Sequence, residues 1–340
     1  MQLALPPLGL GTAALGNLYR PVDQSAAVDA VMAAIDEGIG LIDTAPYYGF
    51  GLSEERVGAA LRQRRPSPGK VVLSTKVGRL LRPIDAGQAS GTRLGFVDAA
   101  PFEPYFDYSY DGVLRSFEQS RARLGCDHIE ILLAHDLGRL VHGSDHEARY
   151  REFIEGGYLA MRRLRDEGSV TAIGLGVNEW EICSQALGDA DFDLFLLAGR
   201  YTLLEQTPLD GFLPLCARRQ VRVLVGGPYN SGILATGSKA PRTAHFDYLP
   251  APPEILERVR RIEAVCAEFG VELAAAALQF PLAHPQIAAV VAGMDGRRQV
   301  AESLRLAGQV IPSAFWSALR DAGLLRPDAP TPEGKRPADE

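Results

Sequence analysis

Four side chains that can hold or move a proton each follow a short run of Val, Ile and Leu in this 340-residue chain. They are Asp43, Tyr48, Lys76 and His135. A lysine that ends an apolar run is costly to bury without a partner, and a carboxylate on the adjacent strand would supply one. A free tyrosine has a pKa of about 10, too high for a base near neutral pH, and a nearby ammonium is expected to lower it. A histidine could then orient the reacting oxygen or relay its proton.

The elements that would carry these residues are eight apolar runs, which alternate with longer amphipathic segments. We expect strands at 8–11, 40–43, 71–76, 129–135, 172–176, 194–197, 221–225 and 288–291. We expect helices near 25–37, 53–64, 110–124, 156–168, 179–188, 208–219, 252–269 and 297–308, and two extra helices near 272–283 and 312–320. This alternation predicts an α/β fold, a single-domain (β/α)8 TIM barrel over residues 1–325 with its active site at the C-terminal face. The four proton-handling residues then share that face because they follow successive strands.

Two long segments interrupt the alternation on the same face. The segment 78–109 is rich in aromatic residues and is interpreted as a satellite core, as a lid over a ligand, or as both. The segment 135–155 is more polar and is expected at the surface. The stretch 326–340 is rich in Pro and charge and is expected to be a disordered tail. A doubly wound sheet is the rival fold, but Gly9-Leu-Gly-Thr-Ala-Ala14 lacks the third glycine of the G-x-G-x-x-G motif.

The composition argues against several classes of partner. The chain is 46% hydrophobic and 23% charged, with a net charge of −7, so neither nucleic acid nor an anionic membrane is an expected partner. No apolar segment reaches the roughly 18 residues that a membrane span needs, and the N-terminus does not resemble a signal peptide. The four cysteines lie far apart, which fits reduced thiols in a cytoplasmic protein, and no His or Cys spacing predicts a metal site.

Four motifs resemble those of the aldo-keto reductase family in order and spacing. They are Asp43-Thr-Ala-Pro-Tyr-Tyr-Gly49, Leu73-Ser-Thr-Lys-Val77, Leu132-Leu-Ala-His-Asp136 and Gly174-Leu-Gly-Val-Asn178. The resemblance covers residues 8–310 and implies a barrel that binds an extended nicotinamide dinucleotide without a Rossmann fold. It implies a catalytic tetrad of Asp43, Tyr48, Lys76 and His135. It also implies that the substrate contacts Tyr47, Tyr48, His135 and Phe106.

The same resemblance implies which residues hold the dinucleotide. They are Gly11, Thr12, Asp43, Asn178, Gly226, Gly227, Pro228, Ser231, Gly232, Leu234, Gly293, Gln299, Glu302 and Ser303. The chain departs from the common pattern, with Gly226 where many relatives have an aromatic residue, Ala198 where they have Gln, and Gln299 and Ser303 where Arg and Asn are frequent. A 2′-phosphate is normally met by Arg or Lys. Because Gln299 replaces the frequent Arg, we expect NAD to be accepted at least as well as NADP, unless Arg297 or Arg298 reaches the phosphate.

The motif Gly226-Gly-Pro-Tyr-Asn-Ser-Gly232, with residues 106–111 and the pair His135-Asp136, resembles a branch of the family that oxidises cyclic hemiacetals. That branch includes D-threo-aldose 1-dehydrogenases, L-galactose dehydrogenases and pyridoxal 4-dehydrogenases. It implies oxidation of the hemiacetal carbon of a cyclic aldose, of the L-fucose or D-threo-aldose type, to a lactone, with Tyr48 as the general base. The alternatives are pyridoxal oxidation, reduction of an aldehyde or ketone by NADPH, and a cofactor-binding regulatory subunit. The expected partner is a small sugar or lactol, and the oligomeric state stays open.

Overall fold

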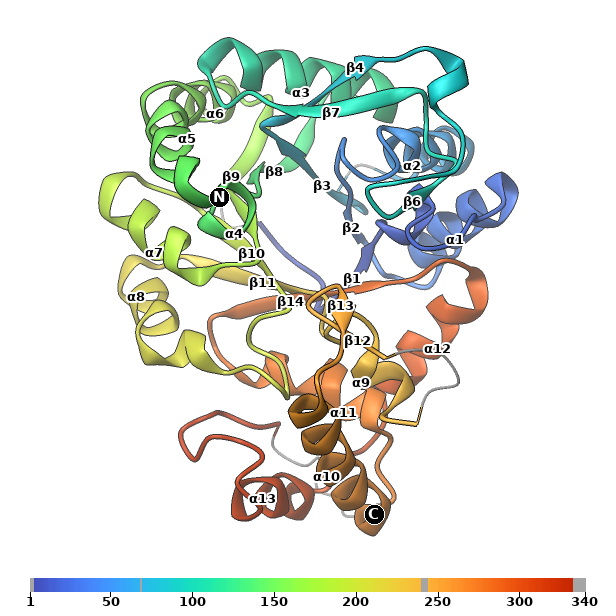
Figure 1. The fold of residues 1–340 in the computed structure, drawn as a ribbon, viewed down its shortest axis with the longest axis vertical. Helices are drawn as coiled ribbons and strands as arrows, with labels where there is room; N and C mark the ends of the chain where they lie inside the picture. Colours follow the sequence, from blue (N-terminus) through green and yellow to red (C-terminus); the bar gives the residue numbers. More distant parts are fainter. Residues whose placement is uncertain (1–2, 68, 240–243, 333–340) are drawn as a thin grey trace.

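Eight parallel strands close into a barrel in the computed structural model of the protein, which describes residues 3–67, 69–239 and 244–332 (Figure 1). The strands follow one another around the barrel in the order β1-β14-β11-β10-β9-β8-β3-β2. Closure occurs at β1 (Leu8–Gly11), which pairs with β2 (Leu41–Asp43) on one side and β14 (Ile287–Gly293) on the other. The remaining strands are β3 (Val72–Val77), β8 (Ile129–His135), β9 (Val170–Val177), β10 (Leu194–Ala198) and β11 (Arg222–Gly226). The predicted (β/α)8 fold is confirmed.

Helices cover the outside of the barrel (Figure 1). They are α1 (Gln24–Asp36), α2 (Leu52–Arg64), α3 (Tyr110–Leu124), α6 (Tyr158–Asp166), α7 (Trp180–Asp189), α8 (Phe212–Arg219), α11 (Leu273–Gln279) and α12 (Arg297–Ala307). Local chemistry sets their ends. Asp23 accepts from the N–H groups of Ser25 and Ala26 at the start of α1, and Gly125, with φ 69°, ends α3.

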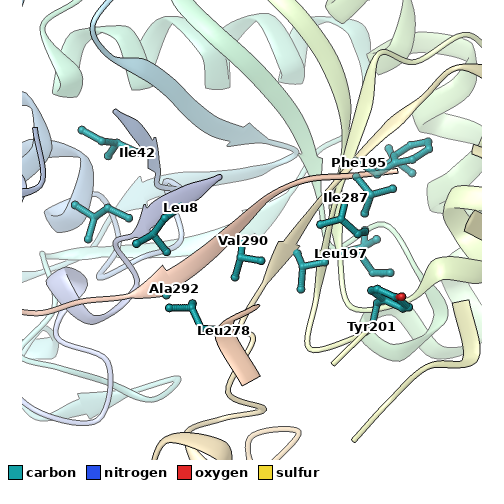
Figure 2. Packing of buried hydrophobic residues seen from close by; sticks show 14 of the residues in the cluster. Leu8, Ile42, Phe195, Leu197, Tyr201, Leu278, Ile287, Val290 and Ala292 are labelled. Carbon is teal, nitrogen blue, oxygen red and sulfur yellow. The ribbon is translucent and has the colours of Figure 1, made fainter. Parts of the chain in front are cut away.

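Two helices exchange the places expected for them. The segment expected as an extra contains α11, and its Leu278 lies beside Val290 and Ala292 of β14 (Figure 2). The segment expected to cover the barrel forms α10 (Pro253–Phe269), which packs on α13 (Ser313–Asp321) farther out (Figure 1). The physical reason is that α11 is apolar all round whereas α10 carries charges over much of its surface, and a helix apolar all round is buried.

The strands bury apolar side chains on both faces. Leu41 belongs to a core inside the barrel and its neighbour Ile42 to the core between the strands and the helices, because successive residues of a strand point to opposite faces. Leu3 and Leu5, from the segment before β1, pack against the inner core. The barrel is therefore a filled scaffold, and its polar groups gather at the ends of the strands.

The segment 78–109 forms a small antiparallel unit beside the barrel. Its outer strands, β4 (Arg79–Pro83) and β7 (Phe102–Phe106), pair with each other, and β5 (Thr92–Arg93) pairs with β6 (Phe96–Val97) between them. Phe96 packs with Phe50, Leu81 and Ala99 in a core of their own. The segment 78–109 thus contains the satellite core that its aromatic residues suggested.

Two further segments contain more structure than the sequence indicated. The segment 135–155 includes α4 (Arg139–His142) and α5 (His146–Glu152). In the expected tail, the backbone N–H of Arg326 donates to Gln206 at 3.2 Å and Ala329 is buried, while 333–340 lie outside the described residues. Of the helices in the described ranges, none alone is long and apolar enough to cross a membrane; Pro253–Phe269 and Leu273–Ala283 meet the length and composition only together, across a bend of 101°.

Candidate active site

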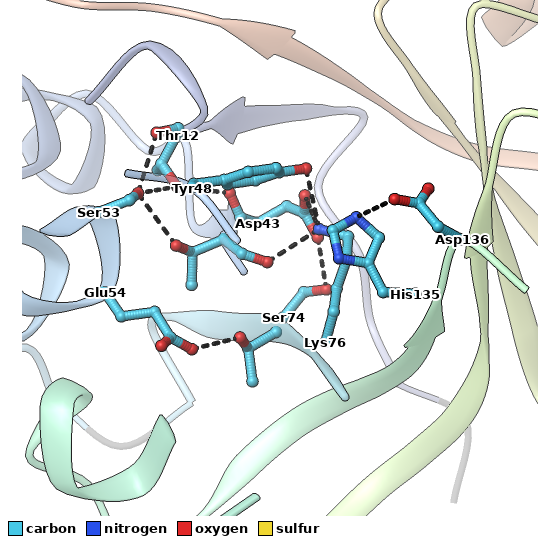
Figure 3. A network of polar contacts seen from close by, with 11 residues as sticks. Thr12, Asp43, Tyr48, Ser53, Glu54, Ser74, Lys76, His135 and Asp136 are labelled. Atoms are coloured by element: carbon cyan, nitrogen blue, oxygen red, sulfur yellow. Dashed lines mark hydrogen bonds and ion pairs between the residues drawn. The ribbon is translucent and has the colours of Figure 1, made fainter. Parts of the chain in front are cut away.

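Lys76 lies at the centre of a polar network at the C-terminal face of the barrel (Figure 3). Its Nζ donates to Asp43 Oδ2 at 2.7 Å, to the carbonyl oxygen of Thr44 at 2.8 Å and to Tyr48 Oη at 3.3 Å. An ammonium has three N–H groups, so each has an acceptor. The side chain is only 2% exposed, and Asp43 balances the buried charge. The structure therefore brings together three of the four predicted catalytic residues.

Strand register and two hydroxyl groups fix the position of Asp43. The pairing of β2 with β3 places Asp43 opposite Ser74, whose Oγ donates to Asp43 Oδ1 at 2.8 Å. Both carboxylate oxygens are thus held, one by Ser74 and one by Lys76. Thr12, which follows β1, donates from Oγ1 to the Asp43 carbonyl at 2.9 Å, and Ser53 of α2 donates to Thr12 at 2.8 Å. The buried Thr12 side chain thus holds the Asp43 backbone, and its expected contact with the dinucleotide stays a prediction.

His135, at the end of β8, stands beside Tyr48. The two rings meet edge to face, with their centroids 6.0 Å apart. The Asp136 carboxylate lies 3.7 Å from His135 Nε2 and forms an ion pair with Arg79. The Arg79 guanidinium in turn stacks on Tyr47, 3.4 Å from the ring centroid. Neither Asp136 nor Arg79 has a role predicted from the sequence, although Asp136 directly follows His135 in one of the motifs and Arg79 lies two residues after β3.

The protonation states of Tyr48 and His135 are set mainly by burial. Burial raises the pKa of the Tyr48 phenol well above its ordinary value of 10, and the Asp43 carboxylate adds to the rise. The net direction is opposite to the lowering expected from Lys76, because burial is the largest cause. Burial also lowers the pKa of His135 to about 3. Both side chains are therefore neutral near pH 7.

These groups lie at the bottom of a cavity of about 750 Å³. Tyr47, Tyr48 and His135, all expected to contact substrate, line it, as does Asp136. Phe106 is not among the lining residues; its ring packs on His142, with centroids 4.4 Å apart, and its contact with substrate stays a prediction. The part of the segment 78–109 that lines the cavity is Leu94 to Phe96, at the turn between β5 and β6.

Several residues expected to hold a dinucleotide lie at or just after the ends of barrel strands. Gly11, Gly226 and Gly293 are the last residues of β1, β11 and β14, and Asn178 follows β9 and lines the cavity. After β11 comes a turn that contains Gly227, Pro228, Ser231 and Gly232 and leads to Leu234 in α9 (Ile233–Thr236). Gly227 and Gly232 have φ of 58° and 99°, which favour glycine. Leu234 is fully buried, so only its backbone could face a ligand.

The start of α12 supplies groups suited to a phosphate. Within the described residues no side chain caps this helix, so N–H groups of its first turn can bind an anion. Gln299 and Glu302 are exposed on α12, whereas Ser303 is buried. Gln299 Oε1 accepts from the N–H of Asp295 at 2.8 Å, and Glu302 pairs with Arg305 at 2.6 Å. The glycine turn after β11 and this helix start stay the predicted positions for the phosphates of a dinucleotide.

Comparisons with known proteins agree with this geometry. Residues 7–323 match the model of the Aldo/keto reductase family. The chain is 42% identical to pyridoxal 4-dehydrogenase of Microbacterium luteolum over 333 residues, which cover 95% of each protein. It is 38% identical to D-threo-aldose 1-dehydrogenase of Pseudomonas sp over 332 residues, which cover 97% of this chain and 96% of that enzyme.

Solved structures support the fold. An aldo-keto reductase from Bacillus halodurans matches with a TM-score of 0.70 at 24% identity and covers 96% of each chain. The glycerol dehydrogenase from Gluconobacter oxydans matches with a TM-score of 0.71 at 24% identity, over 98% of this chain and 95% of that one. At this identity the likeness shows the fold alone, whereas the family match spans nearly the whole chain. The protein is therefore a member of the aldo/keto reductase family of NAD(P)-dependent oxidoreductases.

Proposed function

We propose that the protein oxidises the hemiacetal carbon of a cyclic aldose, of the L-fucose or D-threo-aldose type, or of a similar lactol, to a lactone. The observation that carries the proposal is the Asp43–Lys76–Tyr48 chain of hydrogen bonds, which ends with the phenol at the bottom of a cavity that Asp136 and Asn178 also line. Carboxylate and amide groups can hydrogen-bond the hydroxyl groups of such a substrate. Identities of 42% and 38% to a pyridoxal 4-dehydrogenase and a D-threo-aldose 1-dehydrogenase support it.

In this mechanism Tyr48 is the general base. The hemiacetal carbon loses a hydride and its hydroxyl loses a proton, which leaves the lactone carbonyl. The phenolate form of Tyr48, whose negative charge Lys76 Nζ at 3.3 Å stabilises, accepts the hydroxyl proton on Oη and becomes the neutral phenol. Asp43 keeps Lys76 charged and oriented, and the neutral His135 ring positions the reacting oxygen. The turn after β11 and the start of α12 would hold a nicotinamide dinucleotide, which would supply the hydride acceptor.

The test is to follow the absorbance of reduced nicotinamide with a panel of aldoses, including L-fucose, and with pyridoxal. We expect lactol-dependent reduction of NAD or NADP, and a lactone as the product by mass spectrometry. Efficient reduction of open-chain aldehydes by NADPH, with no oxidation of any lactol, would contradict the proposal. Dinucleotide binding without turnover in either direction would instead indicate a regulatory subunit.

The pKa shifts predict how the rate depends on pH. Because the pKa of Tyr48 is raised well above 10, the fraction able to act as a base grows as pH rises, so kcat/KM for oxidation should increase throughout pH 6–10 without a plateau. Reduction needs the protonated phenol and should be nearly flat over this range. His135, with a pKa of about 3, is already neutral, so neither profile should show an inflection near pH 6.5. An inflection there that His135→Gln abolishes would contradict this assignment.

The preference between NAD and NADP can be measured by comparing the dissociation constants of the two dinucleotides. Gln299 caps the N–H of Asp295, while Arg297 and Arg298 are exposed at the start of α12. A charge-assisted hydrogen bond to a 2′-phosphate contributes about 1.5–3 kcal/mol, or roughly ten- to a hundredfold in affinity. We expect NAD to bind the parent at least as tightly as NADP, and Gln299→Arg to tighten NADP roughly tenfold. Tighter NADP in the parent, lost in Arg297→Ala or Arg298→Ala, would show that one of these arginines meets the phosphate.

A further inference from the structure

The position of the His135 ring depends on the main chain that carries it. Nδ1 of the ring is buried and has no hydrogen-bond partner among the described residues. Nε2 is 3.7 Å from the Asp136 carboxylate, too far for a hydrogen bond. The ring meets Tyr47 and Tyr48 edge to face, with centroid distances of 6.1 and 6.0 Å. Such contacts allow small displacements, so the place of the His135 main chain decides how the ring meets Tyr48.

The main chain turns sharply at this residue. The pairing of β3 with β8 ends at Val77 and Ala134, so the carbonyl of His135 lies beyond the last pair with that strand. Asp136 has φ of 53°, which is uncommon for a residue other than glycine, and its N–H donates to the carbonyl of Gly176 at 3.0 Å. A buried carbonyl oxygen without a partner is costly. The turn therefore needs a hydrogen-bond donor from outside the strands of the barrel.

Tyr108 supplies that donor. Its side chain is fully buried, and its hydroxyl donates to the carbonyl oxygen of His135 at 2.6 Å and lies 3.2 Å from that of Asp136. Nε2 of His142 is 3.0 Å from the same hydroxyl. A hydroxyl has one hydrogen and can also accept, so with its hydrogen on the His135 carbonyl it accepts from His142. Burial raises the pKa of Tyr108 well above 10, and Asp136 adds to the rise, so the phenol keeps its proton near neutral pH.

Two glycines give Tyr108 the space that this position requires. A Cβ atom at Gly78 would lie 2.3 Å from the Tyr108 ring, and the φ of 93° at Gly78 also favours glycine. A Cβ atom at Gly157 would lie 2.5 Å from the Tyr108 carbonyl oxygen. Gly157 ends the π-helix η4 (Phe153–Gly157), a rare element that is frequent at functional sites. The chain is therefore built closely around Tyr108, and this packing directs its hydroxyl at the end of β8.

We propose that Tyr108 is a positioning residue for the reaction, because its hydroxyl fixes the main chain of His135 and so places the His135 ring beside Tyr48. Tyr108 is not among the residues that line the cavity, so it acts through His135 and not on the substrate. The inference rests on the part that the proposed function gives to His135. It holds for oxidation and reduction alike, because His135 meets the reacting oxygen in both directions.

Replacing Tyr108 with phenylalanine tests the inference, because it removes the hydroxyl alone. The probes are oxidation of L-fucose and of pyridoxal by NAD, and reduction of 4-nitrobenzaldehyde by NADH or NADPH. We expect kcat to fall by about ten- to a hundredfold in each reaction that the parent catalyses, the scale for a catalytic group displaced by a fraction of its proper distance. The circular dichroism spectrum and the dinucleotide dissociation constant should stay those of the parent. A variant that loses its fold would make Tyr108 a residue of the fold and would overturn the inference.

A double-variant cycle shows whether the effect passes through His135. His135→Ala removes the ring that Tyr108 is inferred to position. Adding Tyr108→Phe to His135→Ala should therefore change kcat by less than about twofold, because the two residues act as one unit. If Tyr108 only supported the fold, Tyr108→Phe would lower kcat by the same factor with and without the His135 ring. Equal losses in the two backgrounds would overturn the inference.

Tyr158→Phe is the matched control. Tyr158 is also buried, and its hydroxyl also donates to a main-chain carbonyl, that of Asp191, at 3.3 Å. Its ring meets Phe192 edge to face with centroids 5.3 Å apart, and it is not among the residues that line the cavity. Loss of this hydroxyl should leave kcat within about twofold of the parent. The control thus separates the loss of a buried hydroxyl from the loss of the one that holds His135.

The outcomes separate this inference from the proposed function. If the parent reduces 4-nitrobenzaldehyde but oxidises no lactol, the proposed function fails, and the cycle still decides the inference in the reduction. If the parent oxidises a lactol and Tyr108→Phe keeps kcat within about twofold, the inference fails while the proposed function stands. A parent without turnover in either direction would overturn both, since the His135 ring would then have no reaction to serve.

Discussion

Replacing Tyr48 with phenylalanine is expected to lower kcat for lactol oxidation by about 10²–10⁴-fold, the usual contribution of a positioned acid–base group. The substitution removes one oxygen atom and keeps the ring, which meets His135 edge to face with a centroid distance of 6.0 Å. Lys76 loses the most distant of its three acceptors, at 3.3 Å, and keeps Asp43 and Thr44. The fold and the dinucleotide dissociation constant should therefore change little.

The matched control for this substitution is Tyr110→Phe. The Tyr110 hydroxyl accepts from Arg163 at 3.1 Å on the outside of the barrel and does not line the cavity. Its loss should leave kcat within about twofold of the parent, as for a surface substitution. Tyr48→Phe should also lose the rise of the oxidation rate with pH, because the titrating base is gone. Near-full activity in Tyr48→Phe would mean that another group takes the proton.

The relative positions of the barrel strands and the Asp43–Lys76–Tyr48 contact could be predicted from the sequence for one physical reason. Parallel strands of a barrel end at the same face, so residues that follow buried apolar runs must converge there. The apolar run before Lys76 predicts a strand, and the end of that strand determines where the Lys76 ammonium lies. No knowledge of loop conformation is needed to place Asp43 and Lys76, whereas Tyr48 lies in the turn after β2.

The pKa of Tyr48 could not be predicted in the same way. Burial raises this pKa and a nearby ammonium lowers it, so the direction of the shift depends on which effect is larger. The balance depends on distances that differ by less than 1 Å. Lys76 Nζ is 2.7 Å from Asp43 and 3.3 Å from Tyr48, so the carboxylate offsets the ammonium and burial decides. A residue list contains the charges but not these distances.

The mouth of the cavity was equally beyond the sequence. Leu94 and Tyr248 lie in turns whose left-handed backbone is untypical of Leu and Tyr, so no turn rule places them at an opening. The resemblance implies that Phe106 contacts substrate, and in the structure its ring packs on His142. The groups at the reacting carbon could thus be placed from the strand ends. The turns that shape the mouth of the cavity could be located only in the structure.

Lys76→Met is expected to affect both activity and stability. The side chain keeps its approximate length and loses its charge, so Tyr48 loses the group that stabilises its developing negative charge, and kcat should fall by about 10²–10⁴-fold. The Asp43 carboxylate, only 4% exposed, keeps Ser74 as a hydrogen-bond donor but loses its cation. Breaking a buried ion pair by removing one partner lowers the free energy of unfolding by about 3–5 kcal/mol, which urea denaturation can measure.

A double-variant cycle separates these two effects of Lys76. Asp43→Asn in the Lys76→Met background removes the uncompensated carboxylate while Ser74 can still hydrogen-bond the amide, so most of the lost stability should return. Activity should stay low in the double variant, because the phenol still lacks its ammonium. If stability and activity returned together, the loss in Lys76→Met would come from a distorted fold, and Lys76 would have no direct part in the chemistry. Stability regained without activity would place the ammonium in the proton transfer itself.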